Sequence, residues 1–217
     1  MLLVRVAVGT YCLGKKDAME PDARPNGRPF DSTTNDLDNP AFFVTYDNAQ
    51  AFPEYLIKFK PKGEEKAAAA VRDGSPYSLT AVGKGEEKAA AVSAFTKTVT
   101  NAEIVSVERI ENPKLVEAYD AKLKEMMSAN GASAEATERK WLFHGTDEST
   151  VSKIASRGFD RSFCGKDAVA FGKGVYFARD ASLSASPTYA RPNAAGVQHM
   201  LLVRVAVGTY CLGKKDA

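Results

Sequence analysis

The chain begins with the eighteen residues MLLVRVAVGTYCLGKKDA, at Met1–Ala18, and repeats them letter for letter at Met200–Ala217. A folded domain offers a given strand one position in its sheet, so two identical segments must compete for it. A repeat protein would instead show several diverged copies of a short unit. The two copies start 199 positions apart, which predicts a circularly permuted domain or one window of a tandem array with that period.

The composition is that of an ordinary globular protein. Of 217 residues, 44% are hydrophobic and 26% are charged, which predicts one domain with one core. The net charge of +2 gives no general reason to bind nucleic acid or an anionic membrane. No signal peptide or membrane span is expected. Three cysteines without zinc or disulfide spacing favour an intracellular location, cytoplasmic or nuclear.

The first third of the chain contains three predicted strands. Period-two alternation predicts a strand at residues 2–8, and the copy at 201–207 must have the same preference. Residues 17–40 are crowded with Pro, Gly, Asn and Asp and are predicted to be loop. Short aromatic or β-branched runs at 42–46 and 55–59 predict two further strands.

A second, shorter repeat predicts a linker at residues 63–92. GEEKAAAAV at 63–71 recurs as GEEKAAAV at 85–92, around a middle rich in Gly, Ser and Pro. Its Glu, Lys and Ala could form short marginal helices, but they offer almost no apolar surface with which to dock.

Beyond the linker, the sequence predicts a strand at 104–107 and then a helix. Asn112 can cap this helix, with Pro113 at its first position. Apolar residues recur along one face at three- and four-residue intervals, at Leu115, Tyr119, Leu123 and Met126. Such a stripe is more often core than a surface for a partner.

The residues that suggest chemistry begin with a predicted strand that runs into His144-Gly145-Thr146. Asp147 or Ser149 can then cap a helix, which is expected to end at Gly158. A histidine at a strand end is more often a hydrogen-bonded structural residue than a ligand contact, so this motif alone is a weak signal.

A glycine-rich stretch follows, FGKGVYFARDASLSASPTY. It contains a short predicted strand that carries Tyr176, and then a Ser-rich turn with Ser184 and Tyr189. Taken separately, buried tyrosines usually pack in the core and serines usually cap helices.

Taken together and in this order, the segments resemble the catalytic domain of the poly(ADP-ribose) polymerase (PARP) family, the diphtheria-toxin-like ADP-ribosyltransferases. The resemblance is carried by ERKWLFHGT, GFDRSFCGKDAVAFGKGVYFA, HMLLVRVAVG and NPAFFVTYDNAQAFPEYLIKF. The chain looks most like the macrodomain-associated mono-ADP-ribosyltransferase branch. The resemblance implies an α+β ADP-ribosyltransferase fold, with two packed, mostly antiparallel β-sheets and flanking helices.

The order of these segments is permuted relative to the family. The segment ending in AFPEYLIKF closes the family domain, whereas here it lies near the amino terminus. The resemblance therefore implies that residues 1–62 are the carboxy-terminal half of the catalytic domain, 63–92 the linker and 93–217 the amino-terminal half. Joining 93–217 to 19–62 restores the family order without a gap.

The resemblance also implies that NAD+ is the substrate. The first signature position is His144, which is expected to hydrogen-bond the adenosine ribose. The backbone of Gly145 would pair with the nicotinamide amide, and Ser184 would hold the other side of that amide. Thr146 completes the motif and is included among the NAD+-binding residues. No metal is expected to take part.

The remaining signature positions concern the nicotinamide ring and the acceptor. Tyr176, the second position, and Tyr189 would sandwich the ring. The third position is a Glu in polymerising members and corresponds to Phe42 here. A benzyl ring cannot polarise a hydroxyl, which implies transfer of single ADP-ribose units or no transfer. The base would then come from an acidic acceptor, because the nearby Glu54 is expected to lie on the surface.

The loop at 159–173 could fold over bound dinucleotide as a mobile lid. In this loop Arg161 and Lys166 could meet the pyrophosphate, although solvated charges are equally compatible with the sequence. Cys164 could be a reactive thiol, but a small buried hydrophobe is the commoner role.

Three hypotheses remain open at the level of sequence. The chain is an active mono-ADP-ribosyltransferase that moves ADP-ribose from NAD+ to protein acceptors, itself included, with release of nicotinamide. Alternatively it is a non-catalytic module that binds NAD+ or ADP-ribose, or an inactive fragment of a tandem array. The retained His144, Tyr176, Ser184 and Tyr189 favour the first, and Phe42 does not decide between them. The unpaired copy of the duplicated strand could be swapped between chains to form a dimer.

Overall fold

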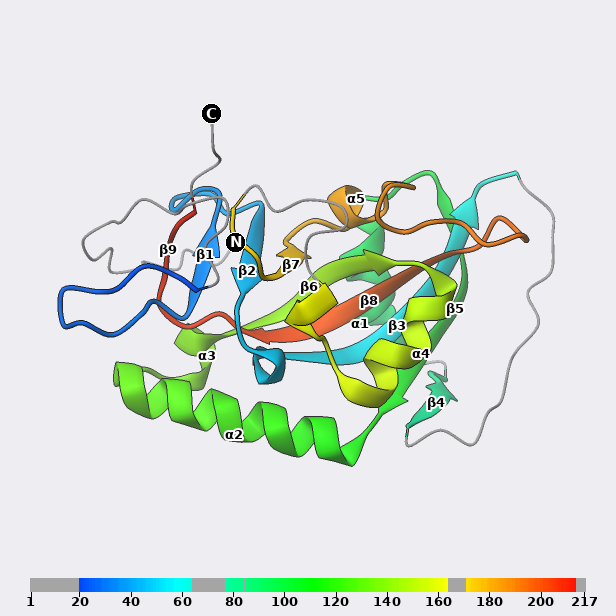
Figure 1. The fold of residues 1–217 in the computed structure, drawn as a ribbon. Coiled ribbons are helices and arrows are strands. Elements are labelled where there is room, and N and C mark those ends of the chain that lie inside the picture. The colour runs from blue at the N-terminus through cyan, green and yellow to red at the C-terminus, as the bar shows by residue number, and fades with distance from the viewer. Residues whose placement is uncertain (1–19, 64–76, 84, 164–170, 214–217) are drawn as a thin grey trace.

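The computed structural model describes residues 20–63, 77–83, 85–163 and 171–213. They build a single hydrogen-bonded sheet of nine strands with helices on both sides (Figure 1). The strands are β1 (Ser32–Thr34), β2 (Phe42–Thr45), β3 (Ala51–Pro61), β4 (Ser78–Ala81), β5 (Ala102–Glu111), β6 (Glu138–Thr146), β7 (Val175–Ala178), β8 (Gln198–Ala206) and β9 (Tyr210–Leu212). The helices are η1 (Asn48–Gln50), α1 (Glu86–Thr96), α2 (Pro113–Asn130), α3 (Ala134–Thr137), α4 (Glu148–Arg157), η2 (Arg161–Phe163) and α5 (Ala181–Ser184).

The strand order is β4-β5-β3-β8-β6-β7-β2-β1-β9, and all neighbours are antiparallel except β1 and β9. The predicted α+β fold with mostly antiparallel strands is confirmed. The two predicted sheets are instead continuous, because β6 and β7 are joined through one residue pair, Phe143 with Ala178. That single pair divides the sheet into a five-strand part and a four-strand part.

The interior strand β8 comes from the carboxy-terminal copy of the duplicated segment. β8 lies between β3 and β6, and Met200, Leu201, Leu202 and Val203 are completely buried. The strand predicted at 201–207 is therefore confirmed. The copy at residues 1–18 lies outside the described residues.

The one charged residue in this apolar strand has a specific partner. Arg204 donates from Nε to the Glu138 carboxylate at 2.7 Å, and its guanidinium lies 5.0 Å from the ring centroid of Tyr119. The Tyr119 hydroxyl donates to the same carboxylate oxygen at 2.8 Å. The arginine charge is thus neutralised by a carboxylate whose side chain is only 9% exposed.

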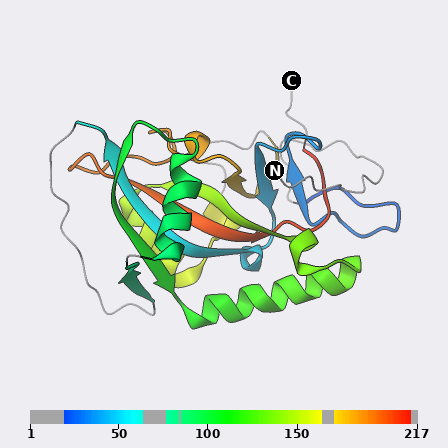
Figure 2. The ribbon, with the colours of Figure 1, turned by 180° about the vertical axis from the view of Figure 1, so that it is seen from behind.

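The helices begin and pack largely as predicted. Asn112 caps α2 by accepting from the backbone of Leu115, and Tyr119, Leu123 and Met126 form its buried face. Asp147 caps α4, which packs against one face of the sheet. Helix α1 covers the opposite face, as seen from behind in Figure 2.

The described part of the predicted linker differs from the prediction. Residues 78–81 form β4 and pair with β5, and α1 begins at Glu86, inside the second GEEKAAAV. Ala91 is completely buried, and Phe95, three residues beyond the predicted linker, packs 4.9 Å from the ring of Phe59. This large aromatic ring, which lies outside the repeat, supplies the apolar surface that the repeat lacks. The division of the chain at 63–92 stays a prediction.

The predicted loop at 17–40 also contains a strand. Ser32–Thr34 forms β1, although its residues are polar, because the buried hydroxyls bond to neighbouring backbone. Ser32 donates to the Val207 carbonyl at 2.7 Å, and Thr34 donates to the Phe42 carbonyl at 2.8 Å. Hydrophobic alternation cannot reveal such a strand, because its buried residues are hydroxyl-bearing.

Candidate active site

The His-Gly-Thr motif lies at the end of β6, with His144 turned toward the adjoining strand β7. Its Nδ1 lies 3.0 Å from the backbone oxygen of Tyr176, and its ring packs against those of Phe159 and Phe177. Burial lowers the pKa of His144 below its ordinary value, and the hydrogen bond to Tyr176 only partly opposes this. A neutral imidazole that donates from Nδ1 keeps a lone pair on Nε2, which can accept from a hydroxyl such as that of a ribose.

Gly145 is in contact with the segment that carries Ser184. A Cβ atom at position 145 would lie 2.1 Å from the backbone oxygen of Ser184 and 3.0 Å from the backbone nitrogen of Ala190. The Ser184 hydroxyl donates to the Phe143 carbonyl at 3.0 Å. Only glycine permits this close approach, which brings together the two residues expected to hold the nicotinamide amide.

Tyr176 and Phe42 lie on the adjacent strands β7 and β2. Their ring centroids are 5.5 Å apart, and Phe171 packs edge-on against Phe42 at 5.1 Å. The Tyr176 hydroxyl accepts from the Phe171 backbone N–H at 3.0 Å and donates to the Gly172 carbonyl at 2.9 Å. The three predicted signature positions therefore lie on the neighbouring strands β6, β7 and β2, with an aromatic ring at the third.

The other two predicted NAD+-binding residues have different surroundings. Thr146 is buried and pairs with His199 across β6 and β8. Tyr189 follows α5, directly before Ala190, and this residue is 38% exposed. The roles of both in binding NAD+ stay predictions.

The second histidine lies on the same strand pair. His199 is buried, its Nδ1 has no hydrogen-bond partner among the described residues, and its Nε2 lies 3.8 Å from Glu148. Burial lowers the pKa of His199, which the neighbouring Glu148 only partly opposes.

Glu54 is not the surface residue that was expected. It is half-buried, and its carboxylate accepts from the indole nitrogen of Trp141 at 2.8 Å. The pairing register shifts on both sides of β8, between Pro53 and Tyr55 on β3 and between Arg139 and Leu142 on β6. These irregularities turn both side chains out of the regular alternation, which no sequence pattern reveals.

The structure describes only part of the loop that was predicted to cover the dinucleotide. The Arg161 guanidinium donates to the Tyr46 backbone oxygen at 2.7 Å, and the Arg161 backbone N–H donates to Asn48 at 3.0 Å. A role for Arg161 at the pyrophosphate stays a prediction. Cys164 and Lys166 lie outside the described residues.

A cavity of about 320 Å³ lies away from the signature residues. It is lined by the segment 20–31, the corner after β2, one face of α2 and Arg161. Within the described ranges, no three His, Cys, Asp or Glu side chains are placed to hold a metal ion. The same ranges contain no helix that is both long and apolar enough to cross a membrane.

The sequence was compared with known protein families and with curated proteins. The family described as poly(ADP-ribose) polymerase catalytic domain matches residues 86–217. Human protein mono-ADP-ribosyltransferase PARP14 is 46% identical over 121 residues, which is 56% of this chain and 7% of that protein. Mouse PARP10, also named a protein mono-ADP-ribosyltransferase, is 38% identical over 112 residues, 52% of this chain and 11% of that protein. Human PARP12, which bears the same class name, is 32% identical over 146 residues, 67% of this chain and 20% of that protein.

The mixed sheet of this α+β fold, together with the family match, gives a domain of the ADP-ribosyltransferase class, as the sequence predicts. The chain belongs to the PARP catalytic domain family. It spans a fifth or less of the length of these three relatives. The family match contains His144, Tyr176 and Ser184, whereas Phe42 lies before it.

Sequence analysis missed a set of hydrogen bonds next to Tyr176. Phe171 bonds to the Tyr176 hydroxyl, and Tyr46 and Thr33 bond to the Phe171 carbonyl. The sequence feature that could have pointed to these hydrogen bonds is Tyr46 itself, a polar aromatic residue at the end of a predicted strand. Its partners are 13 and 125 residues away in the chain, so no local pattern identifies them.

Proposed function

We propose that this chain is a mono-ADP-ribosyltransferase that transfers single ADP-ribose units from NAD+ to protein side chains and releases nicotinamide. The observation that carries the proposal is the meeting of His144, Tyr176 and Phe42. His144 bonds to the backbone of Tyr176, whose ring packs against Phe42. The relatives named above are mono-ADP-ribosyltransferases, which supports the same activity.

In the proposed reaction, the bond between the ribose anomeric carbon and the nicotinamide nitrogen breaks. Its electron pair leaves with neutral nicotinamide, and an oxygen of the acceptor side chain bonds to the same carbon. The transition state has oxocarbenium character, so the protein contributes mainly by orienting the nicotinamide ring and the ribose bonded to it. A neutral His144 can accept from a ribose hydroxyl, and Gly145 offers backbone groups to the nicotinamide amide.

Phe42 determines the kind of product. Elongation needs a group that accepts the proton of a ribose hydroxyl, and a hydrocarbon ring cannot do so. An acidic acceptor side chain is already ionised at neutral pH and needs no such base. We therefore propose that acidic side chains are the acceptors, with the chain itself among the acceptor proteins.

Transfer of single units is the first expected result. Incubation with labelled NAD+ should give labelled protein bands of nearly unchanged mobility, and nicotinamide should appear in equal amount. Long labelled ladders on the gel would refute single-unit transfer. Binding of NAD+ without label transfer would instead favour a non-catalytic module, and absence of both would favour an inactive fragment.

Removal of the Tyr176 ring should weaken ligands of the nicotinamide site. Tyr176→Ala is expected to cost about 1–3 kcal/mol of binding free energy for a benzamide-like inhibitor, the scale of a lost aromatic stacking contact. Titration calorimetry of the inhibitor measures this cost. Tyr77→Ala, at the far edge of the sheet beside β4, is the matched control. Unchanged inhibitor binding by Tyr176→Ala would sink the assignment.

A further inference from the structure

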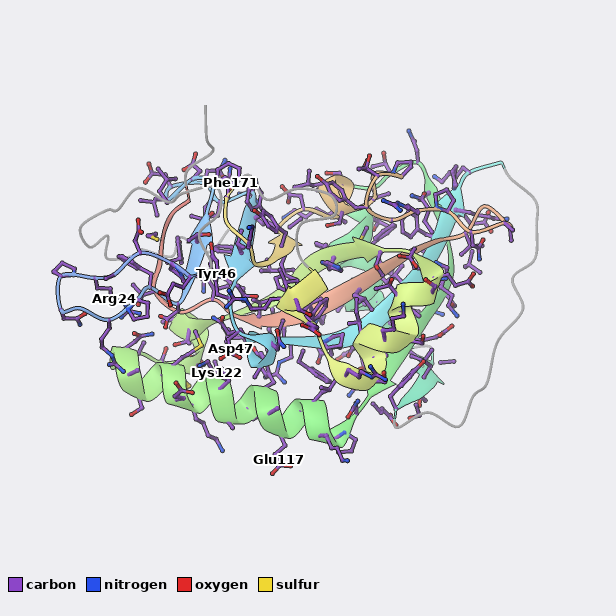
Figure 3. All side chains as sticks on the ribbon, viewed as in Figure 1. Arg24, Tyr46, Asp47, Glu117, Lys122 and Phe171 are labelled. Carbon is purple, nitrogen blue, oxygen red and sulfur yellow. The ribbon has the colours of Figure 1, made fainter. Side chains whose placement is uncertain are left out.

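Tyr46 occupies a particular place next to the candidate site. It follows β2 directly, four residues after Phe42, and its side chain is buried. Figure 3 shows Tyr46 between Phe171 on one side and the pair Asp47 and Lys122 on the other. The reaction proposed above does not use this side chain.

The phenol of Tyr46 holds a peptide group that lies just before β7. Its hydroxyl donates to the Phe171 carbonyl at 3.1 Å. Thr33 lies beside this bond, with its hydroxyl 3.1 Å from the Tyr46 oxygen and 3.3 Å from the same carbonyl. Burial raises the pKa of Tyr46 above its ordinary value, so the phenol keeps the proton that it donates.

The fit between Tyr46 and this peptide is tight. Gly172 has a φ of +113°, and a Cβ atom there would lie 2.2 Å from the Tyr46 hydroxyl oxygen. A side chain at position 172 would therefore be strained and would also displace the phenol. The Tyr46 phenol and the backbone of residues 171–172 are therefore in close contact, with no room for a side chain between them.

The same residue also holds the beginning of the segment that leads to β7. Arg161 donates to the Tyr46 backbone oxygen at 2.7 Å, and its guanidinium lies 5.9 Å from the centroid of the Tyr46 ring. Residues 161 and 171 therefore both form hydrogen bonds with Tyr46. They lie on either side of residues 164–170, which the structure does not describe.

The held peptide is the one that fixes Tyr176. The Phe171 N–H donates to the Tyr176 hydroxyl, and this hydroxyl donates to the Gly172 carbonyl. The Phe171 ring packs against Phe42, which packs against Tyr176. A continuous set of contacts thus runs from the Tyr46 hydroxyl through one peptide to the ring expected to face nicotinamide.

We infer that Tyr46 is a positioning residue for the nicotinamide site: its hydroxyl fixes the Phe171–Gly172 backbone, and this backbone fixes Tyr176. The inference rests on the proposed function, since it assigns Tyr46 to the same site. Tyr46 itself touches no reacting atom. Its loss should therefore weaken the binding of nicotinamide-site ligands more than it slows the chemical step.

The fold around Tyr46 does not depend on this hydroxyl. Asp47 forms an ion pair with Lys122 of α2 at 3.1 Å. Gln50 accepts from the Tyr46 backbone N–H and donates to the carbonyls of Asp31 and Ala206. These contacts keep the corner after β2 in place when only the phenol oxygen is removed, so Tyr46→Phe is expected to fold.

The test is Tyr46→Phe in the full chain. KM for NAD+ and the dissociation constant of a benzamide-like inhibitor should both rise about tenfold, the scale of one lost buried hydrogen bond, while kcat stays within about twofold. Tyr119→Phe is the matched control, because it also removes one buried hydroxyl bond, to Glu138, but away from the site. The control should lower the melting temperature and leave KM unchanged.

Two further measurements separate positioning from general loosening. Amide hydrogen exchange at Phe171 should accelerate in Tyr46→Phe and not in Tyr119→Phe. Combining Tyr46→Phe with Tyr176→Phe should weaken the inhibitor no more than the worse single change, because both act through one peptide. Fully additive losses, or unchanged exchange at Phe171, would overturn the inference. A wild-type chain that binds neither NAD+ nor the inhibitor would overturn the proposed function, whereas the exchange result is independent of activity.

Discussion

Gly145→Ala is expected to abolish binding of nicotinamide-site ligands and to destabilise the fold. The added methyl carbon would lie 2.1 Å from the Ser184 carbonyl oxygen. The backbone fixes the position of this Cβ atom and the carbonyl is itself backbone, so no side-chain rotation relieves the overlap. Helix α5 and the segment at Ala190 would have to move away from β6. The loss in free energy of unfolding should be at least that of an overpacked core, which is typically about 1–3 kcal/mol. Urea unfolding measures the loss of stability, and titration with a benzamide-like inhibitor measures the loss of binding.

A matched control is available on the other side of the molecule. A Cβ atom added at Gly83 would have no neighbour within 4 Å, so Gly83→Ala should change stability by no more than about 0.5 kcal/mol. If Gly145→Ala bound the inhibitor normally, the nicotinamide amide would not lie against this glycine. The assignment of Gly145 and Ser184 would then be wrong.

The sequence predicts the local elements where hydrophobic patterning and caps agree. The alternation of β8 and the cap at Asn112 are visible in a few consecutive residues, and the structure confirms both. β1 shows no such pattern, because hydroxyl groups bonded to backbone take the place of apolar side chains. The start of α1 was missed because Phe95, which anchors it, lies outside the repeated sequence.

The candidate site could be predicted only through the family resemblance. His144 and Tyr176 are 32 residues apart, and Phe42 comes from a strand 102 positions before the histidine. Spacing along the chain does not bring such residues together; the strand order β6-β7-β2 does. Some contacts depend on an irregular strand register, such as that of Glu54 with Trp141. Neither the local sequence pattern nor the family resemblance predicts them.

We propose that this chain is the PARP catalytic domain in circularly permuted order. The family match covers residues 86–217, yet β3 lies between β5 and β8, both of which belong to the matched part. Likewise, β2 and β1 lie between β7 and β9. Residues 20–62 therefore complete a sheet that the matched residues alone would leave interrupted at two places.

The end of the carboxy-terminal copy supports this order. β9 pairs in parallel with β1, and the Gly213 N–H donates to the Thr34 carbonyl at 2.6 Å. In the amino-terminal copy the same sequence continues directly into the segment that leads to β1. Either copy could therefore supply β8 and β9, and the two are expected to be redundant for folding.

Deletion of either copy alone should leave a folded chain, and deletion of both should not. A chain without residues 2–18 keeps β8 as described, and a chain without 201–217 should fill the same position with residues 2–8. Removal of both copies eliminates most of the interior strand β8, including the completely buried residues 201–203, and no sheet of this order can form. Thermal unfolding followed by circular dichroism, together with inhibitor binding, distinguishes these outcomes.

The arginine in each copy can be used to show which copy forms β8. Arg204 neutralises Glu138, whose side chain is only 9% exposed, and a buried carboxylate left without its cation costs about 3–5 kcal/mol. Arg204→Met should therefore destabilise the chain that lacks residues 2–18 by this amount. In the chain that lacks 201–217, Arg5→Met should have the same effect, because Arg5 then faces Glu138 and Tyr119. If both deletions abolish folding and NAD+ binding, the copies are not redundant and the proposal of a permuted domain is wrong.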